Sequence, residues 1–191
     1  MSPETAAVGV SGWPAFQAGW HEFFLMTGTA AVTLAGLLFV AISLHLETLI
    51  HASRSHLLAL ARAMLLSYVM VLTLSLMMLV PGQGMRPVAA EMVAVGTVFF
   101  IITFKQLRKE KGVEHPEFPL SVFRRRLIPT QIGYAMVVLT GVSMLALHTA
   151  ELFYVVISAF CMLLGNATGA SWDLLVRTAK IRRQAEPTAK A

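Results

Sequence analysis

Five long apolar runs dominate this sequence and limit what it can fold into. They lie at roughly 24–46, 57–80, 88–104, 127–147 and 152–176. A transmembrane helix needs about 20 mostly apolar residues to cross the hydrocarbon core of a bilayer. The runs are continuous rather than alternating, which argues against the strands of a membrane β-barrel. The sequence therefore predicts an all-α integral membrane bundle of five transmembrane helices.

The composition supports a membrane protein. Hydrophobic residues make up 57% of the chain and charged residues 13%, whereas soluble domains sit near roughly 45–50% and about 25%. A single water-soluble globule cannot bury that much apolar surface, so the lipid bilayer is the first expected partner. The third run is the shortest of the five, and it carries Glu91 near its start.

The distribution of Lys and Arg predicts the orientation of the chain. Of fifteen such residues, seven lie in 105–126 and five in 177–191. Lys and Arg concentrate in the cytoplasmic loops of membrane proteins. An outside N-terminus and a cytoplasmic C-terminus put all of them inside except Arg86. We therefore expect a transmembrane domain at 24–176 with a basic cytoplasmic loop, 105–126, followed by a basic cytoplasmic tail, 177–191.

Residues 1–23 are then expected to form an extracytoplasmic tail. The tail carries Trp13, Trp20 and Phe23, and aromatic side chains next to a span suit the level of the lipid headgroups. At the other side of the membrane, Pro129 is expected in the first turn of the fourth helix, where proline is tolerated.

The net charge of +5 does not indicate nucleic-acid binding, because no RNA- or DNA-binding motif accompanies it. The basic residues have a simpler role as topology determinants that contact anionic lipid headgroups at the cytoplasmic face. Arg124, Arg125 and Arg126 are the main candidates for this contact, and a patch for a partner protein is the alternative.

Charged residues also mark the inner boundary of the spans. Arg62 lies about one turn inside the second run, so its long side chain can reach the interface. We expect ion pairs at this boundary, in particular Arg62 with Asp173 or Glu47 at similar depth. Asp173 and Arg177 are four residues apart, with the acid first, the better order for a pair on one helix.

No metal and no cofactor are expected. Glu47 and His51 are four residues apart and could share a helix face, but a stable metal site normally needs three or four ligands. Haem ligation from two spans is a weaker idea still. His56 or Asp173 would have to complete the metal site, and the two haem ligands would be His21 and His148.

Small residues predict where the helices pack. Membrane helices approach one another closely through faces with GxxxG spacing. Gly165 and Gly169 have this spacing in the last run, and Gly28 and Gly36 play a similar role in the first. We expect packing within one chain, with contact between two copies as the alternative.

Asn166 and Thr168 are the polar pair expected at depth in the membrane. They suit an interhelical hydrogen bond, or else they line a pore in an oligomer. The residues at the middle of the five runs are uncharged, which disfavours an ion-coupled transporter. Because zinc-protease, serine-hydrolase and nucleotide-binding motifs are missing, no enzymatic activity is expected.

Several segments together resemble a family of small five-span bacterial membrane proteins, largely uncharacterised. The resemblance lies in WHEFF at 20–24, AGLLFVAISL at 35–44, the basic residue Arg62 opening the second run, and ASWDLLV at 170–176. Some members of that family are labelled modulators of the membrane-bound AAA protease of bacteria. The resemblance implies a bacterial inner membrane location and a non-enzymatic accessory role through the cytoplasmic loop. An oligomeric channel or facilitator for a small solute or ion is the alternative function.

Overall fold

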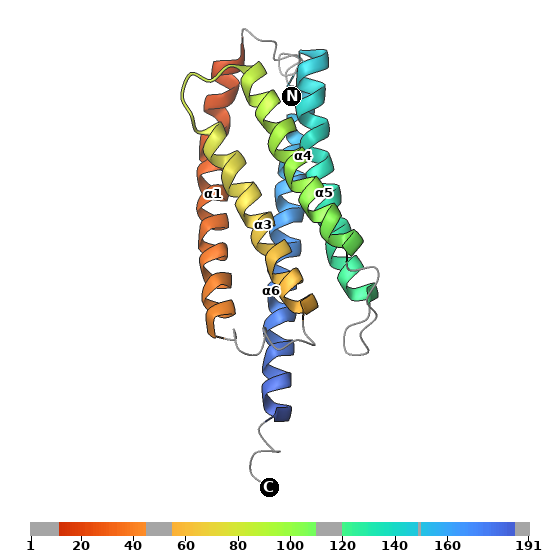
Figure 1. The fold of residues 1–191 in the computed structure, drawn as a ribbon. Helices are drawn as coiled ribbons and strands as arrows, with labels where there is room; N and C mark the ends of the chain where they lie inside the picture. Colours follow the sequence, from red (N-terminus) through yellow and green to blue (C-terminus); the bar gives the residue numbers. More distant parts are fainter. Residues whose placement is uncertain (1–11, 45–54, 110–119, 149, 186–191) are drawn as a thin grey trace.

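Five long helices lie side by side in the computed structural model of the chain (Figure 1), which describes residues 12–44, 55–109, 120–148 and 150–185. All five are long and apolar enough to cross a membrane, and no strand occurs in the described ranges. The elements are α1 (Trp13–Leu44), α3 (Ser55–Met78), α4 (Met85–Lys109), α5 (Leu120–Leu147), the 3-10 helix η5 (Glu151–Tyr154) and α6 (Val155–Ala185). The predicted all-α bundle of five spans is confirmed, and it fits a multi-pass membrane protein.

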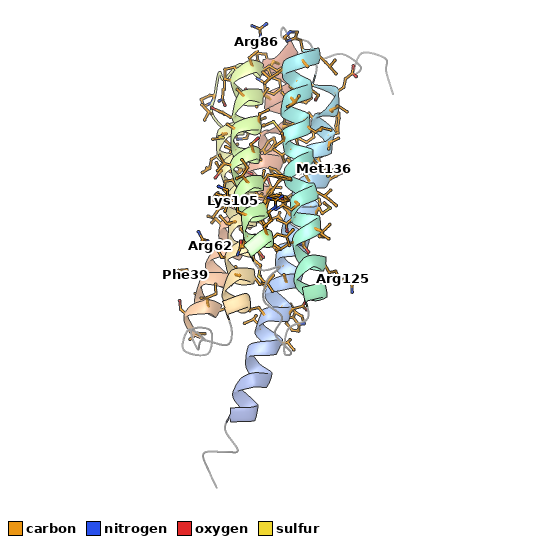
Figure 2. All side chains as sticks on the ribbon, turned by 45° about the vertical axis from the view of Figure 1, so that its right-hand side comes forward. Phe39, Arg62, Arg86, Lys105, Arg125 and Met136 are labelled. Atoms are coloured by element: carbon orange, nitrogen blue, oxygen red, sulfur yellow. The ribbon has the colours of Figure 1, made fainter. Side chains whose placement is uncertain are left out.

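The bundle has two chemically different ends. The start of α1, the turn between α3 and α4, and η5 lie at one end, which we call the aromatic end. The end of α1 and the start of α5 lie at the other, which we call the basic end. Figure 2 shows Arg86 at the aromatic end and Arg125 toward the basic end. Only α6 continues well past the other helices there, so its last turns project from the bundle (Figure 1).

α3 is the central helix. In its most apolar stretch 56% of the residues are buried, compared with 22% in α1. It packs against α1, α4 and α6, while α5 packs mainly between α4 and α6. The helix of the third run, α4, has 25 residues, or about 37 Å at 1.5 Å per residue. The shortest apolar run therefore belongs to a full-length span.

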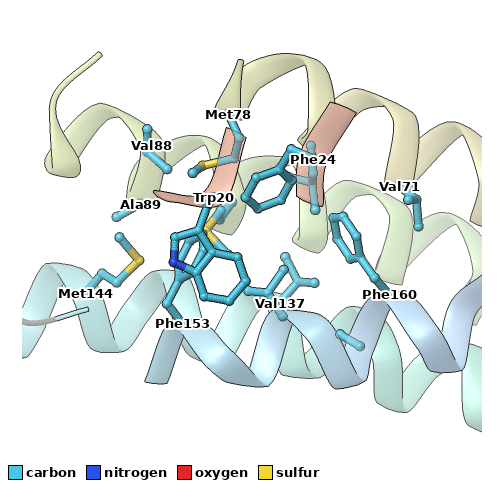
Figure 3. Packing of buried hydrophobic residues seen from close by; sticks show 14 of the residues in the cluster. Trp20, Phe24, Val71, Met78, Val88, Ala89, Val137, Met144, Phe153 and Phe160 are labelled. Carbon is cyan, nitrogen blue, oxygen red and sulfur yellow. The ribbon is translucent and has the colours of Figure 1, made fainter. Parts of the chain in front are cut away.

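The aromatic side chains at the start of α1 lie inside the protein. Trp13 is 2% exposed and Trp20 is 9% exposed, and the Trp20 and Phe153 rings are 5.0 Å apart between centroids. Figure 3 shows Trp20, Phe24, Phe153 and Phe160 packed together. The expected tail, residues 1–23, is therefore helical from Trp13 onward, and its rings pack against η5 and α6. That these aromatic side chains lie at the level of the lipid headgroups stays a prediction.

Side-chain hydrogen bonds attach this first part of α1 to the turn between α3 and α4. The Trp13 indole Nε1 donates to the Gln83 carbonyl at 2.9 Å. The Gln17 amide donates to the carbonyls of Met78 and Val80 at 3.0 and 3.1 Å. These bonds give carbonyls at the end of α3 the partners that a helix terminus lacks. They explain why α1 begins eleven residues before the predicted start of the first span.

The helix of the fourth span begins before its apolar run, although the span itself, Leu127–Leu147, is as predicted. α5 starts at Leu120, so Pro129 lies inside the helix rather than in its first turn. Proline removes one backbone hydrogen bond and crowds the carbonyl four residues earlier, and membrane helices tolerate this where neighbouring groups compensate. The segment 105–126 is therefore no single loop, because both of its ends are helical, as is 177–185 of the predicted tail.

Glycines determine how closely the helices approach one another. Most of the glycines at these contacts are not the predicted ones. A Cβ on Gly28 would lie 3.0 Å from Ser75 Cβ, so α1 and α3 do meet there. A Cβ on Gly36 or Gly165 would meet nothing within 4 Å. Within the described part of the chain these two glycines thus do not make the expected packing, because both face outward, while Gly169 is half-buried.

The tightest approaches occur at glycines that the sequence patterns did not single out. A Cβ on Gly141 would lie 2.8 Å from the Ala89 carbonyl oxygen, and one on Gly96 would lie 2.7 Å from Val138 Cγ2. Both sites join α4 to α5. Gly133 plays the same role between α5 and α6, against Leu163.

Candidate functional site

The positively charged side chains gather toward the basic end. Among the described Lys and Arg side chains, only Arg86 belongs to the aromatic end (Figure 2). The others are all exposed: Arg62 on α3, Lys105 and Arg108 on α4, and Arg125 on α5. A cluster of exposed cations at the edge of an apolar bundle is suited to bind phosphate headgroups or an acidic protein segment.

The helix packing determines the depth of these cations. The Gln106 amide donates to the Ala59 carbonyl at 2.6 Å, which holds the end of α4 against the start of α3. Arg62 and Lys105 are within a turn of these two residues, so they lie at similar depth (Figure 2). The Arg108 guanidinium carbon lies 4.9 Å from the centre of the Phe104 ring, a cation–π contact that orients the charge.

Of the ion pairs expected for Arg62 at the inner boundary, only the one with Asp173 lies within the described residues, and the one with Glu47 stays a prediction. Within the described residues no ion pair joins Arg62 to Asp173, because Arg62 is exposed on α3 while Asp173 is half-buried on α6. A solvent-screened ion pair stabilises little, whereas a snorkelling Arg keeps its charge hydrated. Glu47 lies outside the described residues, and so does the side chain of Arg177.

Three further predictions fall partly or wholly outside the described residues. Glu47 and His51, the candidate metal pair, lie outside them. Arg124 and Arg126 lie in α5, but their side chains are outside the described set, whereas Arg125 is exposed. Among the described side chains no three His, Cys, Asp or Glu lie close enough together to hold a metal ion.

Asn166 and Thr168 connect helices instead of sharing one face. The Asn166 amide donates to Thr130 Oγ1 on α5 at 2.9 Å. The Thr168 hydroxyl lies 3.3 Å from the Tyr68 hydroxyl on α3. The two side chains therefore reach two different helices. This geometry matches the interhelical hydrogen bond of the two alternatives considered for this pair.

Several interior polar residues escaped the sequence analysis. Ser67 on α3 and Tyr134 on α5 are buried, with their hydroxyls 3.3 Å apart. Thr103 on α4 is fully buried, and the amide of Gln131 on α5 is buried as well. The available signal was an isolated hydroxyl or amide within an apolar run, which alone does not tell an interior position from a lipid-facing one.

Comparison with protein-family models, with curated proteins and with solved structures finds no significant match to this chain. The basic end and the interior polar side chains are the two features of the molecule that bear on its function.

Proposed function

We propose that this chain is a non-catalytic accessory protein of a bacterial inner membrane that acts through its basic end. The observation that carries the proposal is the projection of α6, which continues as a helix to Ala185 beyond the ends of its neighbours (Figure 1). We call residues 177–185 the α6 extension. Its sequence contains Arg177, Lys180, Arg182 and Arg183.

The proposed orientation places the aromatic end outside and the basic end in the cytoplasm. Its support is the asymmetry of positive charge between the two ends, which follows the positive-inside rule. A fluorescent protein fused after Ala191 should then be bright, and alkaline phosphatase fused there should be inactive. An active phosphatase fusion would reverse the orientation, and the proposal would lose its cytoplasmic surface.

A projecting basic helix provides two kinds of contact. Near the membrane its charges attract anionic headgroups, by about 1 kcal/mol per Lys or Arg. Farther out the same charges attract acidic surfaces of a partner and accelerate its docking. The helical ends of 105–126, with Lys105, Arg108 and Arg125 exposed, provide a second cationic surface beside it.

The partner to test first is the membrane-bound AAA protease, because the family resemblance implies a modulator of that enzyme. The purified protease and this chain are placed together in nanodiscs of fixed anionic lipid content, and degradation of a reporter substrate is followed. The test variant replaces four residues of the α6 extension with glutamine: Arg177, Lys180, Arg182 and Arg183. We expect the wild-type chain to change the degradation rate and the variant to need about tenfold more protein for the same change, equivalent to about 1.4 kcal/mol.

The matched control is Arg86→Gln, which removes a positive charge from the opposite end. It should behave as the wild type, and the effect of the wild type should weaken as salt is raised, because exposed charges are screened. A protease rate that is the same with the wild type, the variant and no added chain would contradict the proposed role with this partner.

The channel alternative has less support. Its proposed lining residues, Asn166 and Thr168, are engaged with Thr130 and Tyr68 on neighbouring helices.

A further inference from the structure

Gln131 presents an unusual group between two membrane-spanning helices. Both polar atoms of its amide, Oε1 and Nε2, are buried and have no hydrogen-bond partner in the described part of the chain. In a bilayer each polar group left without a partner is costly, since no bulk water is at hand to replace the missing bond. An apolar side chain of similar size would avoid that cost. A buried amide at this position is therefore expected to have a hydrogen-bond partner.

The Thr103 hydroxyl is a second unsatisfied group on the facing helix. Thr103 is 0% exposed. Its hydroxyl faces the Tyr134 phenol, but the geometry between them falls short of a hydrogen bond. The Tyr134 hydroxyl already lies 3.3 Å from Ser67 Oγ. Thr103 therefore offers a hydrogen-bonding group toward α5 from a fully buried position.

The register of α4 and α5 brings these groups to one level. Gly141 lies against Ala89, and Gly96 lies against Val138. Counting along two antiparallel helices from these contacts places Thr103 beside the turn that contains Gln131. Long side chains in a helix lean toward its N-terminus, so the Gln131 amide leans toward the basic end and the level of Thr103.

The hydrogen-bonding groups of Gln131 and Thr103 determine which ligand fits between the two helices. The amide offers a donor and an acceptor, the hydroxyl can do either, and none of these groups carries a charge. A water molecule, which both donates and accepts, fits such a set, and buried waters typically make about three hydrogen bonds to unsatisfied groups. We propose that water molecules bind between α4 and α5, where they pair with Gln131 and Thr103.

The water would enter from the basic end. Gln106 lies one turn from Thr103 in that direction, and its Oε1 is also buried without a partner, so it supplies a further contact on the way. Gln131 lies six residues from Arg125, about 9 Å along α5. Toward the aromatic end the route closes, because the Phe99 ring packs on Tyr134 at 6.1 Å and Val137 is fully buried. The site is therefore a hydrated site that opens only toward the basic end. It is distinct from the cationic surface of the proposed function.

Cysteine accessibility tests this proposal in the full chain in lipid nanodiscs. The native Cys161 is exposed and is first changed to Ser. Gln131→Cys is then compared with Val137→Cys, a matched position on the same helix that is 0% exposed. We expect a small charged methanethiosulfonate to modify Gln131→Cys at least about tenfold faster, because the thiolate that attacks the reagent forms only where the thiol is hydrated. Equally slow reaction at both positions would overturn the proposal.

A second measurement covers the case in which the cysteine itself alters the site. Gln131→Leu and Thr103→Val are compared singly and together by the midpoint of unfolding. If water bridges the two residues, neither single change raises the midpoint, and the double change differs from the sum of the singles because they share a partner. A higher midpoint for Gln131→Leu, together with additive effects, would mean that a dry, unsatisfied amide had been removed, and it would overturn the proposal.

Discussion

The two halves of this bundle are held together by different chemistry. At the aromatic end the buried cluster is built on large rings and methionines, among them Trp13, Trp20, Phe24, Met78, Met144, Phe153 and Phe160. Among the described side chains, the buried cluster toward the basic end has Tyr68 as its only ring, and its other members are alanines, leucines and one methionine: Leu38, Leu60, Ala61, Ala63, Met64, Leu127, Ala167, Ala170 and Leu174. The same bilayer surrounds both halves, so the difference lies in how the helices attract one another.

The contrast is instructive because lipid tails are as apolar as Leu, and burial alone does not drive membrane helices together. The aromatic end relies on ring contacts and on hydrogen bonds from Trp13 and Gln17. The basic half relies on small residues and on hydroxyl and amide contacts, such as Asn166 with Thr130 and Tyr68 with Thr168. The ring contacts are thus concentrated at one end, and the exposed cations lie toward the other.

Truncation of a ring at the aromatic end should have the largest effect on stability. Phe153 is 0% exposed and contacts the rings of Trp13, Phe16 and Trp20. Phe153→Ala should lower the free energy of unfolding by about 3–5 kcal/mol, because it leaves a cavity and removes these contacts. Unfolding in mixed micelles measures the loss. Phe39→Ala, at a ring that is 65% exposed, is the control and should change little. Equal losses would show that the aromatic end has no special role.

A methyl group at the tightest helix crossing should have the next largest effect. Gly141→Ala places a Cβ 2.8 Å from the Ala89 carbonyl oxygen and 3.1 Å from Met92 Cβ. Because backbone cannot rotate away as a side chain does, α4 must shift from α5, at a cost of about 1–3 kcal/mol. The same unfolding assay measures it. A stability equal to that of wild type would mean that the two helices separate easily.

The sequence was sufficient for the number of spans because bilayer thickness sets the length of an apolar run. The sequence was insufficient to predict the residues at which the helices begin. α1 begins at Trp13 and α5 at Leu120, and in both cases the added turns pack on another helix or extend past the apolar run. Pro129 indicated a helix start by its usual preference, yet the packing around α5 accommodates it inside the helix.

Which face of each helix points inward was the part that composition could not predict. A soluble helix is polar on its outer face, and this difference marks its inner face. Here Leu37 and Phe39 are 63% and 65% exposed, so the lipid-facing side is as apolar as the core. Gly36 and Gly165 consequently looked equivalent to Gly141 in the sequence, although only Gly141 meets another helix closely.

A double-mutant cycle should give a smaller but specific effect in the basic half. Asn166→Leu and Thr130→Val each remove one partner of the 2.9 Å hydrogen bond between α6 and α5. Hydrogen bonds between membrane helices are worth about 0.6 kcal/mol on average, so we expect a coupling energy near that value, measured by unfolding of the two single variants and the double variant. A coupling of zero would mean that small-residue packing alone joins these helices.

The smallest effect is expected at a glycine that faces away from the bundle. Gly165→Ala adds a methyl group to α6 where nothing lies within 4 Å. The free energy of unfolding of the single chain should therefore stay within about 0.5 kcal/mol of wild type, as for other exposed positions. Comparison with Gly141→Ala sharpens the contrast, because the same atom is added to two glycines in similar apolar runs. The measurement is best made at several protein concentrations in detergent. A loss of several kcal/mol that grows with protein concentration would show that the outer face of α6 packs against a second copy of the chain, since only a contact between copies depends on concentration.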